Sequence, residues 1–248
     1  MASPFSDEGI VLRRRAYGDA DRILVILTRD HGKLSVMAKG LRRPRARNAA
    51  GMDLLARSQL LLVPGRSMAV LAQARPIGPS PGPPDPVGLA CAGVLAELVD
   101  ATVEEGHPEP RVYEILAEAS ARIGSADADP RLWLALAAFA LAAVGGYQPE
   151  LRVCVACGRE LENREGRFVS ALGGVVQGDC QAGAAALPCS AATLRVLRRM
   201  ALADERTVLR LRWNAVLKDE VEAILIAHLE HHLDRPIKAA RVLVELRP

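Results

Sequence analysis

Residues 8–39 read EGIVLRRRAYGDADRILVILTRDHGKLSVMAK, and this stretch decides the first part of the fold. Its runs of Val, Ile and Leu are separated by Tyr17-Gly18-Asp19 and Asp30-His31-Gly32, which are typical turn sequences. Such runs recur five times before residue 76, at 8–14, 21–28, 33–39, 54–63 and 67–74. Five short strands at this spacing predict a small antiparallel barrel. An OB-type Greek key is the favoured architecture, and an SH3-like barrel is the alternative that strand counting leaves open.

A proline-rich stretch follows the predicted barrel. Residues 76–86 read PIGPSPGPPDP, and six prolines in eleven residues exclude a helix or a central strand. Patterns typical of helices dominate the later sequence, with cap residues or prolines before apolar runs. Helices are expected at about 86–105, 110–123, 130–144, 190–202 and 217–233. Residues 237–246 alternate in part and are expected to be extended.

These signals predict an α+β protein with two domains. An OB-type barrel is expected over 1–78, a Pro-rich linker over 79–86 and an α-helical domain over 87–248. Residues 151–189 differ from their surroundings, because they contain glycine clusters and four of the five cysteines. They are predicted to form a zinc-binding insert within the helical domain.

The cysteine spacing indicates a metal site. Cys154-x2-Cys157 directs two sulfurs to one side of a turn, and a second pair would complete a tetrahedron for zinc. The interval of 22 residues before Cys180 suits a hairpin, although Cys180-x8-Cys189 is wider than the usual second pair. One structural Zn²⁺ per chain is predicted, bound in a zinc-ribbon-like site by Cys154, Cys157, Cys180 and Cys189. Four thiols without metal are the alternative.

The charge is distributed unevenly along the chain. The net charge of the whole chain is +3, but residues 1–80 carry 14 Lys and Arg against 6 Asp and Glu, giving +8. Residues 81–189 carry 7 against 15, giving −8. A basic first third joined to an acidic middle indicates that one part of the molecule binds a polyanion.

With neither a signal-peptide pattern nor a run of 18 apolar residues, a cytoplasmic, nucleoid-associated protein is expected.

The basic residues of the barrel are the candidate nucleic-acid contacts. Residues 39–47, KGLRRPRAR, carry five positive charges in nine residues, and arginine binds phosphate through two parallel hydrogen bonds. A second basic face is expected on the helix after Ser190. Few aromatic residues accompany these charges, so binding should be mainly electrostatic and should accept both single- and double-stranded DNA. The candidates are Arg13, Arg15, Lys33, Lys39, Arg42, Arg43, Arg45 and Arg47 in the barrel, and Arg195, Arg198 and Arg199 on the helix.

Sequence patterns for catalysis are missing. The chain contains no phosphate-binding glycine loop, dinucleotide fingerprint or nucleophile elbow, and its acidic residues are spread along predicted helices. His228 and His232 are four residues apart on a helix and could bind a metal, but a solvated or half-buried helix face is the favoured interpretation. A non-enzyme without a small-molecule substrate is expected.

The opening of the chain resembles a known family. Gly9-Ile10-Val11-Leu12, then the run YGDADRI at 17–23 and AKGLRRP at 38–44, are similar to the start of the RecO family of bacterial DNA-repair proteins. The order of barrel, helical domain and cysteine insert agrees along nearly the whole chain. The resemblance implies a recombination mediator that binds single- and double-stranded DNA and anneals complementary strands. It also implies a role with RecR in loading RecA onto SSB-coated DNA, without nucleotide turnover and without a membrane.

Two other classes of function fit part of the pattern. A basic zinc-ribbon RNA-binding or transcription-associated factor would show the same charge and cysteines, and it would prefer RNA to single-stranded DNA. A metal-dependent nuclease would need a cluster of carboxylates, and the dispersed acidic residues argue against it.

Overall fold

Five strands form a closed barrel in the computed structural model, which describes residues 3–44, 46, 48–49, 51–78 and 85–246. They are β1 (Phe5–Tyr17), β2 (Asp21–Thr28), β3 (Gly32–Ala38), β4 (Arg57–Val63) and β5 (Ala69–Pro76). The order is β1-β2-β3-β5-β4, and β1 closes the barrel by pairing with β4. All neighbours are antiparallel except β3 and β5. This Greek-key order is OB-like, so the predicted fold class is confirmed.

Alternating apolar residues explain the barrel. Leu24 and Ile26 on β2 point inward together with Leu60 and Leu62 on β4, and all four are fully buried. Gly9 lies on β1 where this strand pairs with both β2 and β4. A Cβ atom at Gly9 would lie 2.7 Å from the side chains of Ile26 and Leu60, so a glycine here lets the barrel close.

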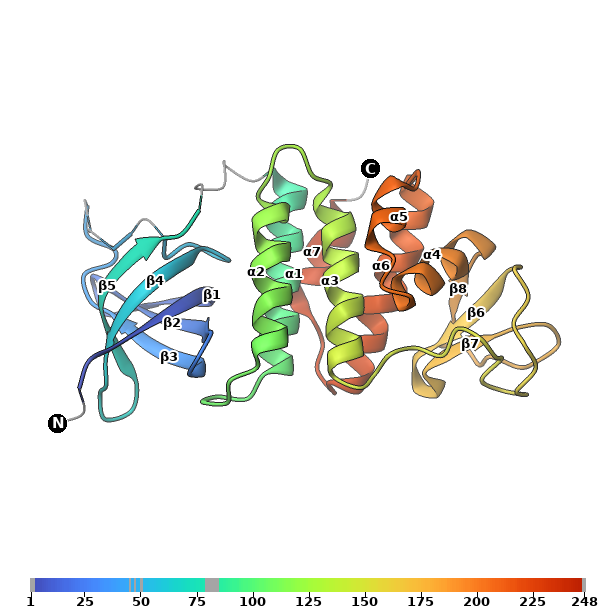
Figure 1. The fold of residues 1–248 in the computed structure, drawn as a ribbon, viewed down its shortest axis with the longest axis horizontal. Coiled ribbons are helices and arrows are strands. Elements are labelled where there is room, and N and C mark those ends of the chain that lie inside the picture. Colours follow the sequence, from blue (N-terminus) through green and yellow to red (C-terminus); the bar gives the residue numbers. More distant parts are fainter. Residues whose placement is uncertain (1–2, 45, 47, 50, 79–84, 247–248) are drawn as a thin grey trace.

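Helices occupy the middle of the elongated molecule (Figure 1). Aspartates at two helix starts accept backbone hydrogen bonds: Asp85 from Gly88 and Asp129 from Arg131. The helices are α1 (Pro86–Thr102), α2 (Pro110–Ile123), α3 (Pro130–Val144), α4 (Ala191–Ala201), α5 (Glu205–Arg210), α6 (Ala215–His232) and α7 (Lys238–Glu245). No helix within the described ranges is both long and apolar enough to cross a membrane.

A small sheet lies at the end of the molecule opposite the barrel (Figure 1). Its strands are β6 (Gly166–Val169), β7 (Gly174–Val176) and β8 (Leu187–Cys189), in the order β7-β6-β8. A single 3-10 turn, η1 (Ser170–Leu172), joins β6 to β7. Phe168 on β6 is fully buried and belongs to the same hydrophobic core as the helices. The cysteine insert is therefore packed onto the helices.

The barrel and the helices also share a core. Ile10, Leu12 and Leu27 of the barrel belong to the same buried cluster as the apolar faces of α1, α2 and α3. Polar contacts add to this junction: the Tyr113 hydroxyl donates to Glu8 Oε1 at 2.6 Å, and Arg57 pairs with the same carboxylate. Burial raises the pKa of Tyr113, so this hydroxyl stays protonated and keeps donating.

Two elements differ from the sequence-based expectation. Residues 237–246 were expected to be extended, but Lys238–Glu245 form α7, which packs against α1, buries Leu243 and leaves Val242 and Val244 exposed. The second difference is α5, a short helix that the sequence did not indicate. Residues 79–84 of the predicted linker lie outside the described ranges.

Candidate nucleic-acid interface and metal centre

A tight turn carries the first two cysteines. The Gly158 amide donates to the Cys154 carbonyl at 2.8 Å, and the Cys154 amide donates to the Arg159 carbonyl at 2.7 Å. Gly158 has a φ of +73°, in the left-handed region that glycine adopts at little cost. The turn therefore holds Cys154 and Cys157 on one side, as the Cys-x2-Cys spacing predicted.

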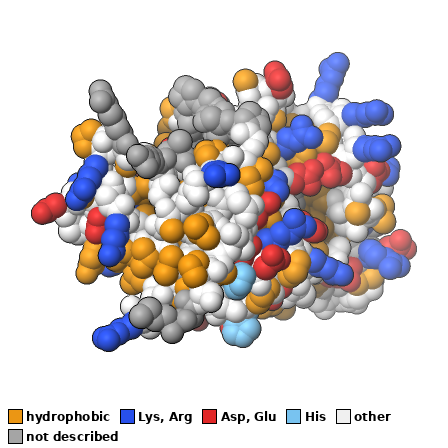
Figure 2. Space-filling view, turned by 60° about the vertical axis from the view of Figure 1, so that its left-hand side comes forward, with side chains coloured by type: hydrophobic (Ala, Val, Ile, Leu, Met, Phe, Trp, Pro, Cys, Tyr) orange, Lys and Arg blue, Asp and Glu red, His pale blue; other side chains and the backbone are white. Residues whose placement is uncertain are grey.

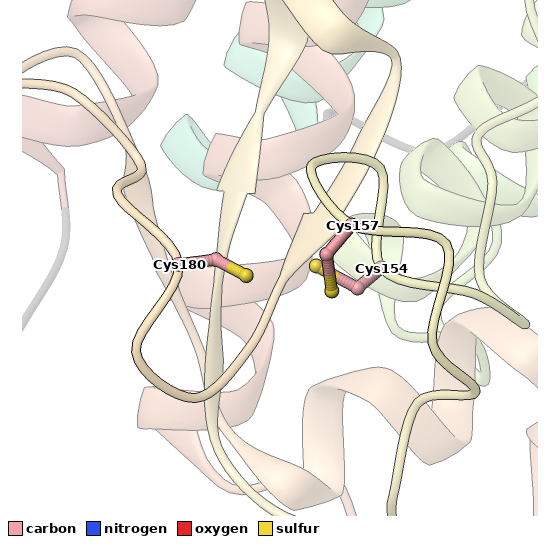
Figure 3. Close-up of side chains that lie close together, drawn as sticks. All are labelled: Cys154, Cys157 and Cys180. Atoms are coloured by element: carbon pink, nitrogen blue, oxygen red, sulfur yellow. The ribbon is translucent and has the colours of Figure 1, made fainter.

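A third cysteine faces this turn from a different loop. Figure 3 shows the Cys180 sulfur directed toward the sulfurs of Cys154 and Cys157. The three sulfurs lie within 4.8 Å of one another. In a tetrahedral zinc site with bonds of about 2.3 Å, neighbouring sulfurs are about 3.8 Å apart, so a small adjustment would let all three bind one ion. Soft thiolates in this arrangement fit Zn²⁺ and would supply three of its four ligands.

Cys189, the fourth predicted ligand, is not part of this cluster. It lies on β8 and is buried in the hydrophobic core, where burial raises its thiol pKa to about 12. A thiol in such surroundings resists the ionisation that metal binding requires. A second Cys-x2-Cys pair would have placed the fourth sulfur at position 183, where this chain has Gly183.

Arg159 was not singled out by the sequence, although it lies only two residues after Cys157. Its Nε donates to the Cys157 sulfur at 3.3 Å, and this hydrogen bond lowers the pKa of Cys157 to about 6. The Cys180 pKa is raised, mainly by the thiol of Cys157. The exposed Cys157 is thus more easily deprotonated for a cation than Cys180.

The second half of β1 and the turn after it form the exposed end of the barrel. Residues 13–19 are all exposed, and Arg15 and Tyr17 lie two residues apart on the same face of the strand. Lys39, Arg42 and Arg43 follow β3 and are exposed as well. The Arg42 backbone amide donates to the Ala20 carbonyl at 2.8 Å, which brings this loop against the β1–β2 turn.

We call Arg15, Lys39, Arg42 and Arg43 the barrel-tip cations. In Figure 2, which turns the barrel toward the viewer, Lys and Arg side chains lie around the edge of the barrel face. Arg42 also donates through Nη1 to the Gly18 carbonyl at 3.1 Å. Arg45 and Arg47, which were predicted to join this surface, lie outside the described residues.

Lys33 and Arg13 lie where the barrel meets α1. The Lys33 side chain is only 15% exposed and contacts Asp100 of α1, with Nζ 3.2 Å from Oδ1. Arg13 Nε lies 3.2 Å from Asp100 Oδ2, but this side chain stays half exposed. The charge of Lys33 is thus engaged at the junction with the helices, and its role in DNA binding stays a prediction. Arg13 keeps only part of its surface free.

The three candidates on α4 differ in exposure and in their hydrogen-bond partners. Arg195 is exposed, and Arg199 is exposed with Asp204 3.4 Å away. Arg198 instead donates to the carbonyls of Leu151 and Leu161 at 2.7 and 2.9 Å, and to Asn163 at 2.7 Å. All three acceptors lie in the cysteine insert or at its start. Arg198 thus holds the insert to α4, and its role in DNA binding stays a prediction.

Comparison with known proteins agrees with this architecture. Residues 1–80 match the family model "Recombination protein O N terminal", and residues 83–241 match "Recombination protein O C terminal". The chain belongs to the RecO family. The protein named DNA repair protein RecO of Symbiobacterium thermophilum is 34% identical over 247 residues, which cover 98% of both chains. The protein of the same name from Desulforudis audaxviator is 36% identical over 235 residues, covering 93% of this chain and 92% of its own.

Proposed function

We propose that this protein is a recombination mediator in DNA repair. The exposed barrel-tip cations of an OB-like barrel, in a chain of the RecO family, carry the proposal. Phosphates of single- and double-stranded DNA would bind Arg15, Lys39, Arg42 and Arg43, with Arg45, Arg47 and the exposed part of Arg13 adding charge. Annealing follows from screening, because a dense cationic surface reduces the repulsion between two strands while their bases remain free to pair.

The proposal extends to partners and domains. Family membership supports action with RecR in promoting RecA loading onto SSB-coated DNA, and it assigns no catalytic step to this chain. Residues 1–78 are proposed as the DNA-binding domain, 79–86 as the linker and 87–248 as the helical domain, with 151–189 as the metal-binding insert. Arg195 and Arg199 are secondary candidates for phosphate contacts, at a distance from the barrel.

One structural Zn²⁺ per chain is part of the proposal. Cys154, Cys157 and Cys180 would hold it, and their spacing and donor chemistry support this choice. The ion would tie the turn at Cys154 to the loop at Cys180 and so add to the free energy of unfolding.

A strand-annealing and binding assay on the full-length chain tests the proposed function. We expect K39E/R43E to weaken DNA binding about 10- to 100-fold, a cost of about 1.4–2.8 kcal/mol, and to slow annealing. Neither of these side chains hydrogen-bonds or ion-pairs with any described residue, so the fold should be kept. Arg42 is left unchanged because its guanidinium binds Gly18.

R195E/R199E is the matched control, since it reverses the same amount of charge on α4. It should weaken binding less than the barrel-tip variant does. If K39E/R43E binds and anneals DNA as well as the wild type, the barrel tip is not the DNA surface. Stronger binding to RNA than to single-stranded DNA in competition would favour the RNA-binding alternative.

A further inference from the structure

Tyr17 differs from the other aromatic residues of this chain. The sequence contains eight aromatic side chains, and all eight are described. Tyr17 is the one that is largely exposed, with 51% of its surface accessible. The other aromatic residue near the barrel surface, Phe5, is half-buried, and its ring lies 4.4 Å from that of His31. The exposed face of the Tyr17 ring is therefore available to stack on an aromatic group of a ligand.

The turn that carries Tyr17 is held in place. Tyr17 is the last residue of β1, and its backbone pairs with Asp21 across the turn. On one side of the turn, Arg42 binds the carbonyls of both Gly18 and Ala20. On the other, the Asp21 carboxylate accepts from the Gly40 amide at 2.7 Å. The ring is therefore presented on a fixed backbone, which lowers the conformational entropy lost when a ligand packs against it.

The surroundings of Tyr17 are cationic. Arg15 lies on the same face of β1, and Arg42 contacts the turn directly. Asp19 is the exposed acidic residue within the turn, whereas Asp21 is engaged with Gly40. An aromatic face beside arginines fits a ligand with a flat aromatic part and a negative charge. An unpaired nucleotide of a DNA strand has both, because its base offers a π-face and its phosphate binds arginine.

We propose that Tyr17 stacks on one unpaired base of a DNA strand whose phosphates bind the barrel-tip cations. This inference rests on the proposed function and gives it a residue that distinguishes single-stranded from duplex DNA. In a duplex the bases are already stacked on one another and offer no free face in the middle of the helix. A single stacking residue would also leave the neighbouring bases free, so it is compatible with annealing.

The test measures the affinity of the full-length chain for two probes across a salt series. One probe is a fluorescein-labelled oligo-dT, which has no secondary structure, and the other is a blunt duplex of the same length. We expect Y17A to weaken oligo-dT binding about 10-fold, equal to about 1.4 kcal/mol. Duplex binding should change less than 2-fold. The salt dependence should keep its slope, because Tyr17 neutralises no phosphate.

Two further variants make the result decisive. Y17F keeps the ring and should bind oligo-dT like the wild type, whereas L202A removes an even more exposed apolar side chain beyond α4 and should have no effect. The proposal is overturned if Y17A weakens both probes equally, if Y17F loses as much as Y17A, or if Y17A binds like the wild type. Failure of the proposed function looks different, because K39E/R43E would then also bind both probes normally.

Discussion

Lys33 on β3 donates a hydrogen bond of 2.6 Å to the backbone carbonyl of Asp100 on α1, and its ammonium group also pairs with the carboxylate of this aspartate. Asp100 is 2% exposed and receives two more cations, Arg13 Nε at 3.2 Å and Arg235 Nη2 at 3.7 Å. These three cations come from β1, from β3 and from the segment before α7. One buried carboxylate on α1 therefore connects the barrel strands β1 and β3 with the segment before α7.

The Lys33–Asp100 contact predicts a stability defect for K33M. The substitution removes the charge but keeps most of the stem, and it leaves the Asp100 carboxylate with two more exposed partners. We expect the free energy of unfolding to fall by about 2–3 kcal/mol. This loss is somewhat smaller than the loss for a buried charge left without any partner, because Arg13 and Arg235 remain. Urea denaturation measures this loss.

K39M is the matched control, because Lys39 is an exposed lysine directly after the same strand, and it should change stability by less than about 0.5 kcal/mol. The double variant K33M/D100N should recover part of the loss, since it leaves no buried charge. If K33M unfolds like the wild type and instead lowers the salt slope of DNA binding by about one, Lys33 contacts a phosphate after all.

Arg198 predicts a second structural effect. R198M removes three charge-assisted hydrogen bonds between α4 and the cysteine insert. Such bonds contribute about 1.5–3 kcal/mol each when isolated but do not add fully, so we expect a loss of about 2–4 kcal/mol in the free energy of unfolding. R195M, on the exposed side of the same helix, should cost less than about 0.5 kcal/mol. Equal stability of the two variants would contradict the role given to Arg198.

The cysteines can be separated by metal analysis. We expect C157S and C180S to lower the zinc content from about one ion per chain toward zero and to reduce stability. C189A should keep its zinc, because this side chain is buried away from the three clustered sulfurs, and should cost about 1 kcal/mol through a small cavity. Loss of zinc from C189A, or an absence of zinc from unchelated wild-type protein, would refute the three-cysteine site.

Local patterns predicted most of the fold. The strands at 21–28 and the helices at 110–123 and 130–144 match the observed elements, because alternation, turn residues and caps act over a few residues. The prediction for the tail at 237–246 was wrong because its apolar residues alternate in part with polar ones, as at Val244, Glu245 and Leu246. The contact with α1 that accompanies its helical structure is distant in sequence.

The candidate site was harder to predict, since a residue type does not reveal its partner. Lys33 is basic and lies in a basic domain, but the carboxylate that holds it is 67 residues away. Arg198 is engaged by carbonyls 37 and 47 residues earlier in the chain. Cys189 shows the same limit: its spacing suggested a ligand, and only the packing of β8 shows that it belongs to the core.

His228 differs from the sequence expectation of a solvated or half-buried face, because it is only 1% exposed. Its Nε2 lies 2.5 Å from the Tyr147 carbonyl, and since a carbonyl only accepts, Nε2 carries the proton and Nδ1 is unprotonated in the neutral ring. The ring also meets Phe168 of the cysteine insert edge-on, at 5.3 Å between centroids. His228 therefore links α6 to both ends of the connection between α3 and β6.

This environment predicts that stability falls at mildly acidic pH. Burial lowers the pKa of His228, and the nearby His231 and His232 lower it further; the pKa of His232 is lowered by burial too. Below about pH 6.5 the unfolded chain binds protons at His228 and His232 more readily than the folded chain does, so the free energy of unfolding decreases as pH falls from 7 to 5. Each group contributes at most about 1.4 kcal/mol per pH unit.

H228Q retains an N–H that can donate to Tyr147 but does not titrate, so urea denaturation should show a shallower pH dependence for H228Q than for the wild type. If H228Q shows the same pH dependence as the wild type, His228 is protonated in the folded chain as readily as in the unfolded one, and the prediction is wrong.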